Sequence, residues 1–314
     1  MESELNRESA APARSLLAPP AGPIDGIRAI LWNERELRAG WRLLIYLVLF
    51  LAFGGAESFA AVLLHLPIVT PTNTTASGLL VQEVILLSAA FAAAAILGVL
   101  EGRGFADYGL PGTAAFGRRF WQGVVWGLVM ISGMILLIRL LGGYSFGELA
   151  LRGRLLWGYA AFWGLVFISV GFFEEFFFRG YPQYTLTSGI GFWPAATMLS
   201  AAFGALHLRN GGEGPVGALS VFVIGMFFCL TLRRTGNLWF AVGLHASFDW
   251  GETFLFSVPN SGVVAPGHLL NSSFHGPVWL TGGTVGPEGS VMAFVVVALA
   301  AAIFSRVYPA RDQS

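Results

Sequence analysis

The chain has 314 residues, of which 55% are hydrophobic and 11% charged, and its mean hydropathy is +0.68. Soluble domains carry about a quarter charged residues, so this composition excludes an ordinary soluble protein and indicates a chain that folds in lipid. The formal net charge is zero, which gives no argument for nucleic acid as a partner. Cys229 is the single cysteine, so neither a disulfide framework nor a cysteine-based zinc cluster is expected.

The first forty residues are polar and lack an apolar run, so we expect no cleaved signal sequence and assign 1–40 to a cytoplasmic segment. Prolines and polar residues over the first ~25 positions indicate disorder. The sequence IRAILWNEREL at 27–37 favours a short interfacial helix that leads into the membrane.

Apolar runs of membrane-crossing length recur between residues 41 and 310. They predict an all-α fold, a single lipid-embedded domain of about eight transmembrane helices. The predicted spans are 43–64, 79–100, 121–141, 155–178, 190–206, 216–232, 238–257 and 291–307. The fifth and sixth spans are among the shortest of these.

Arginines beside the span ends predict the orientation of the bundle, because basic residues remain mainly on the cytoplasmic side. Clusters at 28–42, 103–119, 233–234 and 306–311 agree with an even number of spans and with both termini in the cytoplasm. Arg139, Arg152 and Arg154 fall on the other side and oppose this orientation. We expect an integral membrane protein of a bacterial inner membrane.

Ionisable side chains are costly in lipid and persist where they line a wet cavity or are buried in protein. In this sequence they concentrate in three predicted spans, the fourth, the fifth and the seventh, which suggests one shared internal site. They are Glu174, Glu175, Arg179, His207, His245, Asp249 and Glu252.

Helical spacing relates these residues to one another. Glu175 and Arg179 are four residues apart and can pair, which leaves Glu174 about 100° away around the helix and free for another partner. His245 and Asp249 share a face by the same spacing. Structural alternatives remain for each: an ion pair on the fourth span, and a hydrogen-bonded clasp between helices on the seventh. Glu252 lies near a span end, and we expect it to face water.

Two carboxylates and two imidazoles supply a general base, an orienting partner and an electrophile. A glutamate in such a cavity can take a proton from water for attack on an amide. The imidazoles and the Asp249 side chain can stabilise an oxyanion or, as an alternative, ligate Zn²⁺. The candidate zinc ligands are Glu174, His207 and His245, and the sequence does not decide between metal-bound and carboxylate-activated water.

Three motifs lie in order on the hydrophobic spans. Glu174, Glu175 and Arg179 form EExxxR, and Phe203 and His207 form FxxxH. His245 and Asp249 form Hxxx followed by Asn or Asp. In these motifs the chain resembles the CPBP family of CAAX-protease and bacteriocin-processing membrane proteins, also called Abi. The resemblance covers about 155–257 and points to proteins similar to type II CAAX prenyl endopeptidases.

The resemblance implies an intramembrane endopeptidase that acts at or near the cytoplasmic leaflet on a membrane protein or peptide. It implies Glu174 as general base, His207 as a group that holds the water, and His245 with Asp249 as oxyanion stabilisers. Glu175 and Arg179 would support the site. Relatives in the eukaryotic branch cleave prenylated proteins, and others are linked to bacteriocin maturation, immunity or scaffolding.

Two other functions stay open from the residues. A non-catalytic membrane scaffold or immunity-type protein would use the polar cluster for packing or for a partner. A transporter would use the carboxylates as a proton relay, but the two similar halves that many transporters show are not evident here. One geometric difficulty concerns the site itself. Simple antiparallel spans would put Glu174 and His207 at opposite ends, so a shared site needs a short or tilted fifth span, or re-entry over 181–191.

Overall fold

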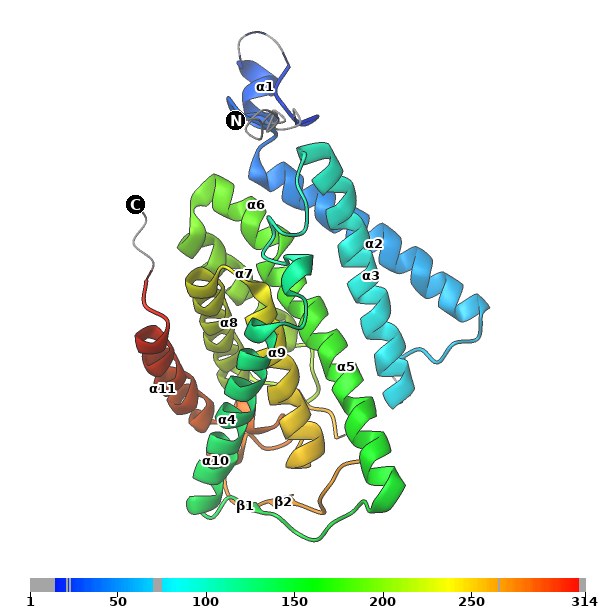
Figure 1. Cartoon of the computed structure of the whole chain (residues 1–314), viewed down its shortest axis with the longest axis vertical. Coiled ribbons are helices and arrows are strands. Elements are labelled where there is room, and N and C mark those ends of the chain that lie inside the picture. The colour runs from blue at the N-terminus through cyan, green and yellow to red at the C-terminus, as the bar shows by residue number, and fades with distance from the viewer. Residues whose placement is uncertain (1–14, 21, 23, 70–74, 265, 311–314) are drawn as a thin grey trace, which may run out of the picture.

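Long apolar helices dominate the computed structural model, which describes residues 15–310 except 21, 23, 70–74 and 265 (Figure 1). The chain is an all-α membrane bundle, as the composition predicts. The helices are α1 (Gly26–Leu31), α2 (Ala39–Leu63), α3 (Ala76–Glu101), η1 (Gly112–Ala114), α4 (Arg118–Leu140), α5 (Gly153–Arg179), α6 (Tyr181–Ile190), α7 (Phe192–His207), α8 (Pro215–Thr235), α9 (Leu238–Trp250), η2 (Gly251–Leu255), α10 (Val278–Thr281), η3 (Pro287–Gly289) and α11 (Val291–Val307). The strands are β1 (Tyr144–Ser145) and β2 (Ser273–Phe274).

Five stretches within the described residues are long and apolar enough to cross a membrane. They are α2, α3, α4, α8 and a continuous stretch, Gly153–Ile190, that contains α5 and α6. The other three predicted spans correspond to shorter helices: α7 has 16 residues, α9 has 13 and α11 has 17. The predicted seventh span, 238–257, is α-helical only to Trp250 and continues as the π-helical turn η2.

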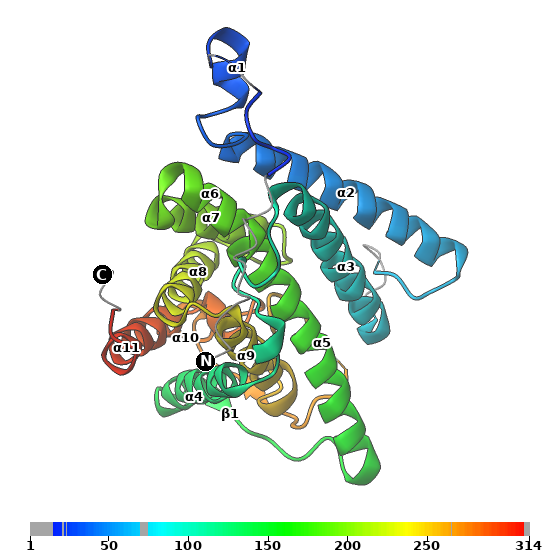
Figure 2. The ribbon, with the colours of Figure 1, turned by 45° about the horizontal axis from the view of Figure 1, so that its top comes forward.

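Helix α9 lies inside the bundle and packs against α4, α5 and α8 (Figure 2). Nearly all of its residues are buried, so its length need not match the thickness of the bilayer. Its start is fixed by Asn237, whose side-chain oxygen accepts a hydrogen bond from the Trp239 backbone N–H at 2.9 Å. This cap sets the register in which His245 and Asp249 follow.

Glycines let α9 approach its neighbours closely, a usual device of membrane helix packing. A Cβ added to Gly127 of α4 would lie 2.1 Å from the Ser247 hydroxyl oxygen and 2.2 Å from the Leu244 carbonyl oxygen. A Cβ on Gly171 of α5 would lie 3.0 Å from the Ala246 nitrogen. The second contact brings the backbone of α9 against the part of α5 that carries Glu174.

The eight long helices alternate in direction along the chain, from α2 through α3, α4, α5, α7, α8 and α9 to α11, with α6 as a short link (Figure 1). We call the end where α2 begins and α11 ends the terminal end, and the opposite end the distal end. At the distal end β1 pairs with β2, and the Tyr144 hydroxyl donates to the Phe256 carbonyl at 2.8 Å. These contacts hold the segment between η2 and α11 against the bundle.

The N-terminal predictions were wrong in part. The helix expected over 27–37 is confined to α1, because Trp32 is extended and pairs with Leu37 in an isolated bridge. The expected disorder does not extend to all of the first ~25 residues: the Leu16 N–H donates to the Leu100 carbonyl, and the Leu37 N–H donates to the Leu17 carbonyl. The remainder of that prediction, over residues 1–14, lies outside the described residues.

Candidate active site

The last turns of α5 present two adjacent glutamates to different surroundings. Glu175 is fully buried and accepts hydrogen bonds from Arg179 Nη1 at 3.2 Å and from His245 Nδ1 at 3.0 Å. Glu174 points about 100° away, as helical geometry requires, and its side chain is 23% exposed. The expected Glu175–Arg179 ion pair is therefore present, and it leaves Glu174 free for another partner.

Arg179 is enclosed by aromatic rings. Its guanidinium carbon lies 5.5, 4.5 and 5.3 Å from the ring centres of Phe178, Phe203 and Phe228. Such cation–π contacts stabilise a cation that is removed from water. Phe203, the aromatic residue of the second motif, thus packs against the cation of the first.

His245 joins α9 to both glutamates. Its Nε2 atom lies 3.6 Å from Glu174 Oε2 and 3.5 Å from Asp249 Oδ2, and its ring stacks on Phe228. Because ionised Glu175 can only accept, Nδ1 must carry a proton. A neutral ring would then present a lone pair to two carboxylates. This geometry therefore favours an imidazolium, or a proton on one of the two acids.

His207 lies at the end of α7 and reaches the same cavity from another side. Its Nδ1 lies 2.9 Å from the Phe203 carbonyl oxygen, which fixes Nδ1 as the donor and leaves Nε2 able to accept. Among the described residues, no hydrogen bond or ion pair is recorded from His207 to Glu174, His245 or Asp249. The segment 181–190, where re-entry was one solution, forms the helix α6 instead.

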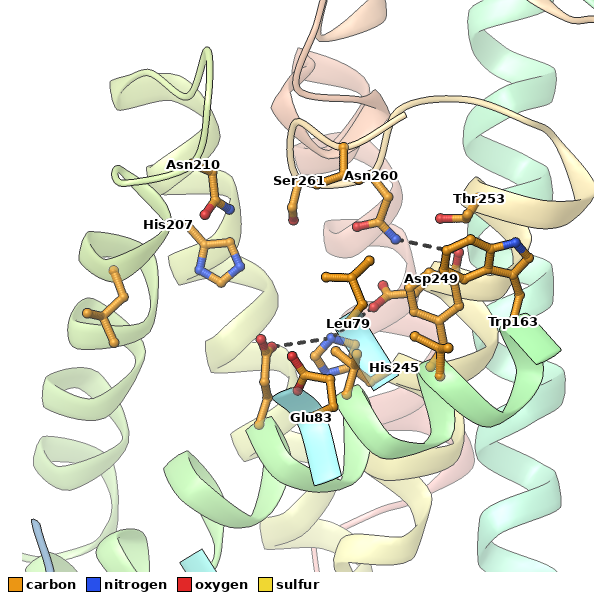
Figure 3. A pocket seen from close by; sticks show the side chains of 16 residues that line it. Leu79, Glu83, Trp163, His207, Asn210, His245, Asp249, Thr253, Asn260 and Ser261 are labelled. Carbon is orange, nitrogen blue, oxygen red and sulfur yellow. Dashed lines mark hydrogen bonds and ion pairs between the residues drawn. The ribbon is translucent and has the colours of Figure 1, made fainter. Parts of the chain in front are cut away.

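A cavity of about 300 Å³ collects these groups (Figure 3). Residues of α3, α5, α7, α9 and the segment after η2 line it. Some of them, such as Trp163, are apolar, and others, such as Asn260, are polar. The predicted residues that line it are Glu174, His207, His245 and Asp249. Glu175 and Arg179 lie behind them, outside the lining.

Glu83 of α3 is a cavity residue that the sequence reasoning missed. It is 9% exposed, it interacts electrostatically with Glu174, His245 and Asp249, and its Oε2 atom has no hydrogen-bond partner in the described structure. Figure 3 shows its side chain beside His245. The signal was available, because Glu83 is an acid inside the predicted span 79–100.

Glu252 does not face water, contrary to the prediction. It is 1% exposed, because the π-helical turn η2 turns it into a second, smaller cavity of about 50 Å³ that adjoins the first at His245 and Asp249. Glu288 of η3 lines the same cavity and accepts a hydrogen bond from the Ser261 N–H. Burial raises the pKa of Glu288 to about 7. Glu288 was not predicted, because it follows a long loop without a motif.

The candidate zinc ligands can be compared with this geometry. Within the residues that the structure describes, no group of three or more His, Cys, Asp or Glu side chains is arranged to hold a metal ion. His245 and His207 each engage Nδ1, with Glu175 and with the Phe203 carbonyl oxygen, so Nε2 is the atom of each ring that could face a metal. Glu174, His207 and His245 are not gathered as a set of metal ligands in this arrangement, so we derive no step through a metal, and zinc stays a prediction.

Comparison with known families gives a match over the part of the chain that builds this site. Residues 156–251 match the family described as Type II CAAX prenyl endopeptidase Rce1-like. The match spans less than half of the chain and contains all three motifs, so the resemblance inferred from the motifs is confirmed. No curated protein matches the chain.

Proposed function

We propose that this integral membrane protein is an intramembrane endopeptidase that cleaves a membrane-associated protein or peptide, with Glu174 as its general base. One observation carries the proposal: Glu174 is turned into a cavity of about 300 Å³, whereas Glu175 beside it is sealed by Arg179 and His245. A cluster built only for packing would bury both acids, whereas Glu174, although 3.6 Å from His245 Nε2, keeps 23% of its side chain exposed. The Rce1-like match supports a peptidase as the class of activity.

In the proposed reaction Glu174 takes a proton from water, and the water oxygen attacks the carbonyl carbon of the scissile amide. His207 Nε2, free because Nδ1 is engaged, accepts a hydrogen bond from that water. When the carbon–nitrogen bond breaks, Glu174 returns the proton to the departing amine. The products are one carboxylate end and one amine end, and Glu174 is restored.

His245 and Asp249, which line the same cavity as Glu174, are the proposed stabilisers of the oxyanion. A protonated His245 donates from Nε2, and Glu175 keeps the ring oriented through Nδ1. Asp249 can donate only while its carboxyl group is protonated, because an ionised carboxylate has acceptors alone. Preorganised donors of this kind stabilise developing charge without reorganisation during the reaction.

The test is cleavage of a membrane-presented peptide library by the purified full chain. Glu174→Gln keeps the size of the side chain and removes the base, and Glu148→Gln, at an exposed position, is the matched control. We expect cleavage by the wild type and the control, and none by Glu174→Gln, with equal folding of all three. Equal cleavage by Glu174→Gln would reject the proposal. No cleavage by any of them would favour a scaffold.

A further inference from the structure

The cavity of the candidate site extends to the distal end of the bundle. Leu79 lies in the first turn of α3, which begins at that end, and His207 is the last residue of α7, which ends there. Asn260 and Ser261 follow η2 at the same end and lie across the cavity from His245 (Figure 3). A polypeptide that enters from the distal surface therefore reaches the reactive groups directly.

The terminal side of the site is closed by buried charged groups. Glu175 and Arg179 fill the turn of α5 beyond Glu174. Further toward the terminal end, Arg42 of α2 lies 3.5 Å from Glu101 of α3, and the Tyr181 hydroxyl of α6 donates to Glu101 at 2.6 Å. The cavity lining includes none of these buried groups, which are Glu175, Arg179, Arg42, Glu101 and Tyr181.

The arginines lie mainly at this closed end. Those at 28–42, 103, 118–119, 233–234 and 306 are at or beyond the terminal ends of the long helices. Four lie near the distal ends: Arg139, Arg152, Arg154 and Arg209. Because basic residues beside membrane spans remain mainly in the cytoplasm, this bias favours a cytoplasmic terminal end and a non-cytoplasmic distal end.

We propose that the site takes its substrate from the non-cytoplasmic side of the membrane, through the distal mouth of the cavity. That the bound molecule is a substrate rests on the proposed peptidase function, whereas the side of access does not. Access from this side differs from the cytoplasmic access that the family resemblance implies. A prenylated C-terminus presented in the cytoplasm would meet the closed terminal end.

The chemistry of the cavity indicates the class of substrate. Leu206, 47% exposed, and Val263 give the mouth an apolar edge, while Glu83, Glu174 and Asp249 line the interior. Within the described structure neither arginine nor lysine lines the cavity. Three carboxyl groups line the interior beside two imidazoles, so an acidic group beside the scissile bond would be unfavourable there. The substrate that fits is an extended, membrane-anchored polypeptide segment, neutral or basic rather than acidic beside its scissile bond.

Cysteine labelling tests the side of access without any substrate. The background is Cys229→Ser, which removes the one native cysteine, itself buried beside Ser200. Val264→Cys, at a position 70% exposed beside the mouth, reports on the distal end. Thr113→Cys, exposed in η1, is the matched control at the terminal end. A membrane-impermeant maleimide is applied to spheroplasts and to inverted membrane vesicles of a bacterial expression host.

We expect Val264→Cys to be labelled in spheroplasts and Thr113→Cys only in inverted vesicles. The reverse pattern, or equal labelling of each variant from both sides, would overturn the proposal. A second measurement uses the peptidase assay: a bulky maleimide on Val264→Cys should block cleavage at least tenfold, and the same label on Thr113→Cys should not. Undiminished cleavage by the labelled Val264→Cys protein would also overturn it.

The two proposals fail in different ways. If no variant and no wild type cleaves any peptide, the peptidase proposal fails, while the labelling pattern still decides the side from which the cavity opens. If cleavage is present but the mouth is labelled only from the cytoplasmic side, the peptidase proposal stands and the side of access is wrong.

Discussion

The polar cluster of this protein has a sealed region and an open region, and both start from adjacent residues of α5. In the sealed region Glu175 is bonded to Arg179 and His245 behind a wall of phenylalanine rings. In the open region Glu174, Asp249 and Glu83 line a cavity. The same residue type is thus fixed in one place and left reactive in the other.

The difference shows that one helix can carry a residue that stabilises the fold, Glu175, directly beside a residue that is open to a substrate, Glu174. A buried charge is tolerated when it is paired and hydrogen-bonded, so the sealed region should contribute to folding. A carboxylate that lines a cavity is available for a proton and for a substrate. Variants of the sealed region should therefore lose stability first, and variants of the open region should lose activity or selectivity first.

The largest effect on stability is expected for Arg179→Gln. Removing the cation leaves the buried Glu175 with the His245 ring alone to balance it, which should lower the free energy of unfolding by about 3–5 kcal/mol. Arg154→Gln, an exposed arginine in the first turn of the same helix, is the control and should change stability little. Denaturant unfolding in detergent measures both. Equal stability of the two variants would mean that the sealed region does not support the fold.

Packing of α9 gives the next largest effect. Gly127→Ala forces a methyl group into the Leu244 carbonyl and the Ser247 hydroxyl, and such overpacking should destabilise by about 1–3 kcal/mol. Gly133→Ala on the same helix meets nothing within 4 Å and should be neutral. Thermal unfolding of both proteins checks the contrast. A neutral Gly127→Ala would show that α4 and α9 do not approach this closely.

Glu83 in the open region should influence which peptides the protein prefers to cleave. Peptides with lysine beside the scissile bond should have a lower KM than matched peptides with glutamate, because the interior of the cavity is acidic. At a pH where Glu83 is ionised, Glu83→Gln should reduce this preference several-fold, an effect of about 1 kcal/mol for one nearby charge. It should leave kcat for neutral peptides nearly unchanged. A preference that survives in Glu83→Gln would remove Glu83 from substrate recognition.

Stability should depend on pH through Glu288, which burial holds with a raised pKa of about 7. The folded state then binds a proton more tightly than the unfolded state, so this contribution is complete below the ordinary glutamate pKa. It is lost as pH rises through about 7. We expect the Tm to fall by a few degrees over this range. In Glu288→Gln, which mimics the protonated group, that part of the pH dependence should disappear.

The smallest effect is expected for Asp249→Asn. An amide always offers N–H donors, whereas the carboxyl group donates only when protonated, so the variant should cleave within a few-fold of the wild-type rate. Asp249→Ala removes the donor and should lose activity as far as an oxyanion-hole deletion does, about 10²–10³-fold. Initial rates at several pH values compare the two. Equal loss in both variants would argue that Asp249 acts as a carboxylate.

Much of the fold follows from local hydrophobicity, which the sequence displays directly. The last span was predicted at 291–307, the bounds of α11, because apolar runs end where polar residues begin. The pairing of Glu175 with Arg179 follows from helical spacing alone. Short-range rules do not give the length of a helix that is buried by other helices, which is why 238–257 was predicted as one continuous span.

The remainder of the site depends on contacts between distant segments. That Glu83 faces His245 depends on how α3 packs against α5, and Glu288 reaches the second cavity through a long connection. Glu252 was expected in water because its sequence position is near a span end, but η2 turns it inward. An acid within a predicted span was the signal for Glu83, and no comparable signal existed for Glu288.

The comparison between the two glutamates of α5 is tested most directly by the cleavage rate of Glu174→Gln, measured beside Glu175→Gln together with the unfolding temperature of each. We predict that Glu174→Gln loses at least about 100-fold in rate while its unfolding temperature stays at the wild-type value. Glu175→Gln should unfold at a lower temperature. A Glu174→Gln protein that cleaves at the wild-type rate would contradict the account.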